Sequence, residues 1–346
     1  MTAERQLLVE TLDQLLTTHC GPEAVDAAEG IWDPGIWRLL EETGLTSVGL
    51  PDGVGAAGGD LHDAIAIIQC LGRHAAPVPW AETAMLAGWV LLEAGLPWED
   101  RPSTVTPPGS AQVRLDEGVL HGVASSVPWA GCVDRLVVLA RTGDDRPHVA
   151  LVDPQHCQVQ SGANIAQEPR DTVRFDGTTP DAVAEVDEPL VGALTDRGAL
   201  ARTAQMVGAQ SRALDLTIEY ASTREQFGRH VGSFQAVSQQ IAILAGEAAA
   251  AAAALHGAVD AVAGGDGALQ VAMAKVRTAQ AASLVGSIAH QVHGALGFTQ
   301  EHRLQHFTRR MWSWRDEFGT QGWWEEVIGR RLVTQGAATL WSSLTT

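Results

Sequence analysis

The hydrophobic periodicity of this 346-residue chain changes twice, and the order of the changes limits the folds that are open to it. From about residue 4 to 100, apolar residues recur every three or four positions, as in RQLLVETLDQLLTTH and DLHDAIAIIQCLGRH, which is typical of amphipathic helices. From about 105 to 190 the apolar runs are short, as in VRL and HVALVD, and Gly, Pro and Asp bound them. This pattern predicts short antiparallel strands. From about 195 the helical period returns.

A helical, then β, then helical order predicts separate packed layers and not an alternating βαβ sheet. We therefore expect an α+β chain, mainly α, with an N-terminal helical domain over 1–100, a middle β domain over 101–190 and a C-terminal helical bundle over 191–346. Four long helices are expected in the bundle, near 195–222, 234–263, 267–292 and 322–344. No GxGxxG motif follows a strand, which argues against a Rossmann domain.

Charge and cysteine content exclude several classes of function. The formal charge is −18, and the 23 Lys and Arg residues are scattered, so nucleic acid is not an expected partner. The four cysteines lie far apart without a CxxC pair, which predicts neither a zinc site nor disulfides and suits a reducing cytoplasm. No uninterrupted apolar run approaches the roughly 18 residues of a membrane span. We expect a cytoplasmic protein with no membrane partner.

The segment YASTREQFGRHVGSFQ, residues 220–235, places a guanidinium, a glycine turn and an amide between two helical stretches. This combination suits a site for a phosphorylated cofactor, although an arginine after a helix is more often a solvated partner of the helix end. A second glycine-containing loop, QVHGALGFTQ, starts at residue 291. His290 and His293 flank its start, but no third ligand recurs at helical spacing, so we interpret them as packing contacts and predict no metal.

Longer stretches around these motifs resemble the flavin-dependent acyl-CoA dehydrogenases. They are LLEETGLTSVGLPDGVGAAGGDLHDAIAIIQCLGRHAAPVPWAET, LHGVASSVPWAGCVDRLVVLAR, GAQSRALDLTIEYASTREQFGRHVGSFQAVSQQIA and QVHGALGFTQEHRLQHFTRR. The resemblance covers nearly the whole chain. It implies an α-helical N-terminal domain, a small middle β-barrel and a C-terminal four-helix bundle, in dimers or dimers of dimers with each FAD between subunits.

The resemblance also implies cofactor-binding residues that serve an FAD seated mainly in the neighbouring subunit. They are Arg224 at the pyrophosphate, Phe227 and Gln235 at the adenosine portion, and Gln291, Gly294 and Gly297 in a loop whose backbone amides approach the cofactor. An arginine fork suits a pyrophosphate, and glycine permits close backbone approach. Ala295 stands where the family has another glycine.

The general base that these enzymes need to remove the substrate α proton is missing at both family positions. One position directly precedes a Gly-Thr pair near the C-terminus, and here Phe318 precedes Gly319 and Thr320. The other lies early in the first helix of the C-terminal domain. Counting back from Arg224 puts it at Gly198.

Nearby carboxylates do not simply replace the base. Asp196 lies two residues from the second position, which on a helix points it in roughly the opposite direction. Asp316 and Glu317 remain weak catalytic candidates, and their alternative interpretation is exposed charge before a turn. The catalytic residue is therefore unknown.

Residues that would bind a flavin ring to this chain itself are also missing. LLEAGLPWED passes through RPSTVTPPGS directly into AQVRL, without the Thr-Glu-Pro…Gly-Ser-Asp type motif that lines the ring in the family. Ser126 and Pro128 occupy the following segment, where the family has Trp and Thr, and proline has no backbone donor. Trp129 is interpreted as a core residue.

These features together resemble the short, catalytically incomplete subunit of the α2β2 acyl-CoA dehydrogenases of actinobacterial steroid side-chain breakdown. That interpretation implies a longer partner subunit with the catalytic glutamate, an FAD shared at the mixed interface and an acyl-CoA substrate. Two alternatives stay open. One is a self-sufficient homo-oligomeric FAD enzyme with a relocated carboxylate base, and the other is a non-enzymatic scaffold with the same fold.

Overall fold

The computed structural model describes residues 2–336 and confirms the predicted order of helical, β and helical regions. Five α-helices and a π-helical segment form the N-terminal region: α1 (Ala3–His19), α2 (Pro22–Ala27), α3 (Pro34–Glu42), α4 (Leu61–His74), η2 (Ala81–Gly88) and α5 (Trp89–Glu93). Local chemistry sets where these helices begin. The Asp60 side chain accepts from the Asp63 N–H and the Asp63 side chain accepts from the Asp60 N–H, a capping box that starts α4.

The middle region forms a sheet that has its own core. Its strands are β1 (Ser103–Val105), β2 (Ala111–Asp116), β3 (Val119–Pro128), β4 (Arg135–Arg141), β5 (Pro147–Val152), β6 (Gln158–Gln160), β7 (Arg170–Thr178) and β8 (Ala182–Glu185), in the spatial order β6-β7-β3-β2-β4-β5-β8. Leu120, Leu136, Val173 and Phe175 are buried inside this layer. Most pairings are antiparallel, as predicted, but β4 pairs in parallel with both β1 and β2.

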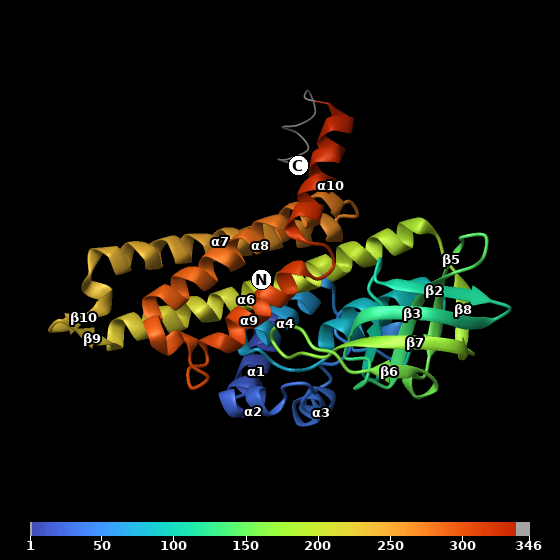
Figure 1. Cartoon of the computed structure of the whole chain (residues 1–346), viewed down its shortest axis with the longest axis horizontal. Coiled ribbons are helices and arrows are strands. Elements are labelled where there is room, and N and C mark those ends of the chain that lie inside the picture. The colour runs from blue at the N-terminus through green and yellow to red at the C-terminus, as the bar shows by residue number, and fades with distance from the viewer. Residues whose placement is uncertain (1, 337–346) are drawn as a thin grey trace.

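The C-terminal region contains α6 (Glu188–Thr223), α7 (Gln235–Ala263), α8 (Ala268–His293), α9 (Leu304–Asp316) and α10 (Gln321–Gln335). The first three match predicted helices, and α10 begins where the fourth was predicted, but the periodicity analysis missed α9, which packs against α6 and α8. In Figure 1, α10 stands away from the bundle instead of completing it. The predicted end of that helix, beyond residue 336, lies outside the described residues.

The N-terminal helices and the bundle share one core, since two glycines bring α4 and α6 into backbone contact. A Cβ atom at Gly208 of α6 would lie 2.0 Å from the carbonyl oxygen of Gln69. A Cβ atom at Gly72 of α4 would lie 2.4 Å from the carbonyl oxygen of Gln205. Both distances are too short for any real side chain, so these positions accept only glycine in this packing.

A buried lysine fixes the chain just after α9. The Nζ atom of Lys275, on α8, donates to the carbonyl oxygens of Trp314 and Glu317 at 2.8 Å each. Lys275 is fully buried and makes no ion pair with the described residues. Burial lowers its pKa to about 7. The lysine thus anchors the turn that carries residues 317–319.

The helix α7 qualifies, by length and composition alone, as a possible membrane span, which the search for uninterrupted apolar runs did not register. Only 22 % of its most apolar window is buried inside the chain. One such helix is weak evidence for a membrane. α7 also packs along α8, and its Glu247 pairs with Arg277 of that helix.

Replacing Gly208 by alanine should destabilise the protein by about 2 kcal/mol or more, because the added methyl group forces α4 and α6 apart. The matched control is Gly257→Ala on α7, where no atom lies within 4 Å of the new Cβ. The control should be neutral or stabilising by up to about 1 kcal/mol through helix propensity. Chemical denaturation of both variants measures the difference, and equal stabilities would contradict the close contact.

The buried Lys275 should make stability rise with pH. Its folded-state pKa of about 7 lies below the ordinary lysine pKa of 10.5, so the unfolded chain binds more protons between these values. From about pH 7 to about pH 8.5 the free energy of unfolding should increase by about 1–2 kcal/mol. Denaturation of Lys275→Met at the same two pH values should show little of this increase. A slope that persists in the variant would show that another group causes it.

Candidate functional site

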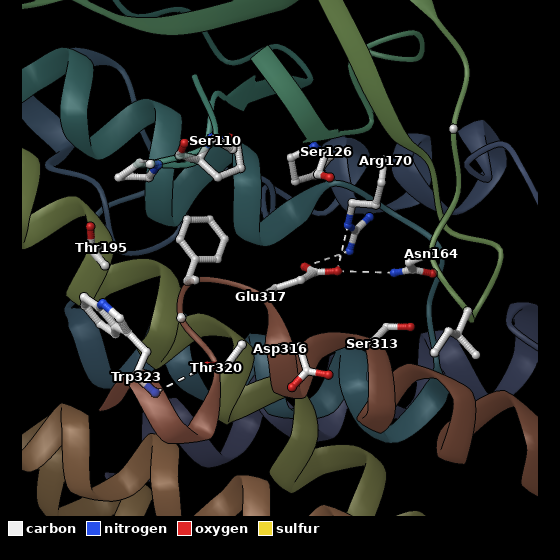
Figure 2. A pocket seen from close by; sticks show the side chains of 18 of the residues that line it. Ser110, Ser126, Asn164, Arg170, Thr195, Ser313, Asp316, Glu317, Thr320 and Trp323 are labelled. Atoms are coloured by element: carbon white, nitrogen blue, oxygen red, sulfur yellow. Dashed lines mark hydrogen bonds and ion pairs between the residues drawn. The ribbon is translucent and has the colours of Figure 1, made fainter. Parts of the chain in front are cut away.

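A cavity of about 990 Å³ lies between the β layer and the C-terminal helices (Figure 2). One wall comes from the β layer and includes Pro107, Pro108 and Pro128. The opposite wall includes Trp312 and Trp323, from α9 and α10. The cavity is therefore mainly apolar, and its charged side chains among the described residues are those of Arg170, Asp316 and Glu317.

The two positions where a base was expected lie against each other beside this cavity. A Cβ atom at Gly198 would be 2.1 Å from a ring carbon of Phe318, so the phenyl ring fills the space above the glycine. Phe318 is 8 % exposed and has a φ of +52°, in the left-handed region that non-glycine residues seldom adopt. The guanidinium of Arg202 also lies 5.4 Å from the centre of this ring. An aromatic ring thus occupies the place predicted for a carboxylate.

The interpretation of Glu317 as an exposed charge before a turn was wrong, because its side chain is largely buried. Its carboxylate accepts from Arg170 at 2.8 and 3.0 Å and from Asn164 at 3.3 Å (Figure 2). It also accepts from Arg202 at 2.7 Å. Burial disfavours the anion, but the two guanidinium groups outweigh it and hold the pKa of Glu317 at about 2. A carboxylate this acidic is a poor acceptor for a substrate proton.

The network around Glu317 continues into all three regions of the chain. Arg202 of α6 also bonds Glu82 of η2, at 2.6 Å. Glu168, which precedes β7, accepts from Arg170, Arg310 and Trp314 at 2.9–3.2 Å. Sequence reasoning missed this network, because its members are dispersed along the chain. The one available signal was a set of charged residues inside apolar stretches, such as Glu82 in WAETAML.

The other weak candidate, Asp316, is exposed at the cavity edge and pairs with its neighbour Arg315 at 3.0 Å. The structure therefore places neither candidate as a free base aimed into the cavity. Nor do the residues that face a flavin ring in the family fit one here. Pro128 offers no N–H, and Ser126 is held at a φ of +54°. Trp129 is buried, as predicted for a core residue.

The first cofactor motif lies at the far end of α6. Arg224 caps this helix through its N–H, which donates to Tyr220, while its side chain makes no hydrogen bond or ion pair with the described residues. A short hairpin follows, of β9 (Glu225–Gln226) and β10 (Arg229–His230). Phe227 at its tip is 91 % exposed. Gln235 begins α7 and is also exposed.

The second motif comes to the same end of the bundle as the first. The rings of Tyr220 and His293 stack at 4.6 Å, which joins the end of α6 to the end of α8. Gln291 is exposed, and Gly294 has a φ of +61° with open space where a side chain would be. Gly297 is closely packed, since a Cβ there would lie 2.9 Å from His293. A free guanidinium and an open glycine backbone suit a pyrophosphate.

His290 and His293 make packing contacts beneath this loop. His290 stacks on Phe298 at 4.4 Å and bonds Thr308, and burial lowers the pKa of both histidines. Elsewhere, Asp13, Cys70 and His74 bring potential metal-ligand atoms together. Burial raises the pKa of the Cys70 thiol to about 12, which disfavours the thiolate that metals bind.

The cavity and the cofactor motifs lie far apart on one rigid helix. Gly198 and Arg224 are both carried by α6, which runs from the β layer to the hairpin in Figure 1. At 1.5 Å per residue their separation is roughly 40 Å. This is much longer than a dinucleotide, so one FAD cannot occupy both places.

Comparison with known proteins gives the same picture of the fold. Residues 2–98 match the acyl-CoA dehydrogenase N-terminal domain, and residues 191–333 match the acyl-CoA dehydrogenase C-terminal domain. The acyl-CoA dehydrogenase IpdE2 of Mycolicibacterium smegmatis is 32 % identical over 318 residues, covering 90 % of this chain and 93 % of IpdE2.

Two solved structures extend the likeness. A chain of the ChsE4–ChsE5 complex from Mycobacterium tuberculosis has a TM-score of 0.90 and 28 % identity, over 97 % of this chain and 99 % of that one. A chain of the Tcur3481–Tcur3483 steroid ACAD has a TM-score of 0.86 and 25 % identity, with the same coverage. On these matches and the two domain models, the chain belongs to the acyl-CoA dehydrogenase family.

Proposed function

We propose that this chain is the non-catalytic subunit of a hetero-oligomeric, FAD-dependent acyl-CoA dehydrogenase. In this proposal a longer partner subunit supplies the base, and this chain completes the partner's FAD site. The observation that carries the proposal is the contact of Phe318 with Gly198, which fills both expected base positions with an apolar ring. Such a chain can bind and orient a cofactor, but it has no group at those two positions to accept the substrate proton.

The distal end of the bundle is where this chain would hold the cofactor. Arg224 would bind the pyrophosphate, Phe227 and Gln235 would contact the adenosine portion, and the loop from Gln291 to Gly297 would offer backbone amides. When bound, FAD supplies the acceptor for the hydride that leaves the substrate β carbon. The exposed side chain of Arg224, which is unpaired among the described residues, supports this role, since a permanent charge without an internal partner is available to an external anion.

An exposed apolar surface near this end supports a tight subunit contact. Phe227, Phe298 and Ile243 are 91, 72 and 51 % exposed, and Ile218 and Leu296 are 46 and 39 % exposed. Large apolar groups gathered at one end of a chain commonly mark a protein interface. The mainly exposed helix α7 belongs to the same surface in this proposal, which assigns it to a partner subunit in the cytoplasm and not to a membrane.

The substrate class follows from the family and its relatives. An acyl-CoA thioester is the substrate we propose for the assembly. Because one similar structure is described as a steroid ACAD, we propose a bulky polycyclic acyl group. Both the substrate and its proton acceptor would then be bound mainly by the partner.

Two alternative functions have less support. A self-sufficient enzyme needs a relocated base, but Glu317 is held by Arg170 and Arg202 with a pKa of about 2. A non-enzymatic scaffold would have no reason to keep an unpaired Arg224 beside an open glycine loop. The hetero-oligomeric subunit accounts for both the filled base position and the retained cofactor motif.

Arg224→Ala should lower the FAD affinity of the complex between this chain and the longer partner subunit proposed above. Loss of one charge-assisted contact predicts a decrease of about 10-fold to 100-fold. FAD content after dialysis, measured by absorbance on complexes matched by size-exclusion chromatography, gives the result. Arg38→Ala is the control, because Arg38 is an exposed arginine without a partner among the described residues. Equal FAD content in all three complexes would contradict the assigned role of Arg224.

A further inference from the structure

A second, smaller cavity of about 260 Å³ lies on the opposite side of α6 from the main cavity. Thr195 lines the main cavity, whereas the next two residues, Asp196 and Arg197, line the small one. Its other walls are Trp89, at the start of α5, and the turn between α7 and α8. The cavity has no role in the proposed flavin chemistry.

Arg197 is half-buried and yet lacks a carboxylate partner. Its guanidinium carbon lies 4.5 Å from the centre of the Trp89 ring, and its Nε donates to the Met85 carbonyl at 3.2 Å. Within residues 2–336, its Nη1 and Nη2 atoms have no hydrogen bond or ion pair. Burial lowers the pKa of Arg197 to about 10, opposed only by the longer-range influence of Glu93.

This isolation contrasts with the other buried arginines. Arg170, Arg202 and Arg310 each bind at least one glutamate within 3.2 Å. A guanidinium stacked on an aromatic ring keeps its hydrogen-bonding edge available in the ring plane. The two free Nη groups of Arg197 can therefore bind an anion bidentately inside the small cavity.

Asp196 provides a matching unpaired acceptor. It is partly buried, and it has no hydrogen-bond or ion-pair partner in the described part of the chain. Burial raises its pKa to about 6, weakly opposed by Arg331. Asp266, also in the cavity wall, lies 3.8 Å from Arg331 and so does not neutralise Arg197. Two groups of opposite charge thus line one pocket without pairing with each other.

We propose that this pocket binds a small organic carboxylate that carries a hydroxyl or amino donor next to its carboxyl group. The carboxylate pairs with the Nη atoms of Arg197, the donor bonds Asp196, and the apolar part contacts Trp89, Leu200 and Val271. The pocket volume of about 260 Å³ lies below the roughly 300–1,000 Å³ of ordinary ligand pockets, so only a small molecule fits. A singly charged carboxylate is favoured over a phosphate dianion, since Asp196 and Asp266 add negative charge to the walls.

The test uses the full-length chain and L-lactate as the probe, with binding measured by ligand-observed NMR or calorimetry near pH 7. Lactate should bind with a dissociation constant of about 1 mM, and propionate, methyl lactate and inorganic phosphate should each bind at least about fivefold more weakly. Propionate lacks the donor, methyl lactate lacks the charge, and phosphate replaces the carboxylate. No lactate binding up to about 50 mM, or tighter binding of phosphate than of lactate, would overturn the proposal.

Two variants locate the site. Arg197→Gln should weaken lactate binding by about tenfold or more, while the exposed control Arg38→Gln should leave it unchanged. Asp196→Ala should abolish the preference for lactate over propionate while keeping the carboxylate contact. Asp196→Ala therefore still tests the proposal if Arg197→Gln fails to fold. Wild-type binding in Arg197→Gln, or a preserved preference in Asp196→Ala, would place lactate elsewhere.

Discussion

The ion network around Glu317 is the interaction that joins the three regions of this chain. Glu82 comes from the N-terminal helices, Arg170 from the β layer, and Arg202 and Glu317 from the C-terminal helices. Burying such charges is expensive unless each one is paired, so the network stabilises only the arrangement that brings all of them together. It also commits the Glu317 carboxylate to two guanidinium groups. The same contacts that join the layers therefore remove the nearest carboxylate from proton transfer.

The long helix α6 divides the molecule into two functional ends. Near its start, Gly198 receives the ring of Phe318 and leaves no base at the main cavity. At its end, Arg224 and the glycine loop form an exposed edge that suits a pyrophosphate. These ends lie roughly 40 Å apart, which is too far for one FAD to reach both. We therefore propose that Arg224 and the glycine loop bind part of an FAD held mainly by another subunit. The small Arg197 pocket is separate from both ends.

Much of the fold could be predicted because its signals are local. α6, α7 and α8 extend over 36, 29 and 26 residues that are rich in helix-forming alanine. Asp187 and Asp60 mark helix starts by their capping chemistry. α9 was missed since its sequence, LQHFTRRMWSWRD, is polar on average, with charged residues among its buried positions, although its buried residues recur at helical spacing. The parallel pairing of β4 was also out of reach, because strand direction depends on contacts between distant segments.

In the candidate site, too, contacts between residues far apart in the sequence could not be predicted. Counting along the chain identified Phe318 and Gly198 as positions without a base, but only the folded structure shows that one fills the space above the other. Glu317 was interpreted as an exposed charge, because nothing local shows that Arg170 and Arg202 lie beside it. Such networks cannot be recognised in the sequence when their members lie far apart along the chain. Whether a carboxylate in such a network can accept a proton depends on its burial and on its partners in the folded structure.

The most direct test is to co-express this chain with a longer acyl-CoA dehydrogenase that carries the catalytic glutamate, to co-purify the two and to count the bound flavin. Phe318 fills the expected base position, and the proposed cofactor-binding edge faces outward, so we expect one FAD per two chains and dehydrogenation of an acyl-CoA only by the complex. One FAD per chain, or a yellow and active preparation of this chain alone, would contradict it.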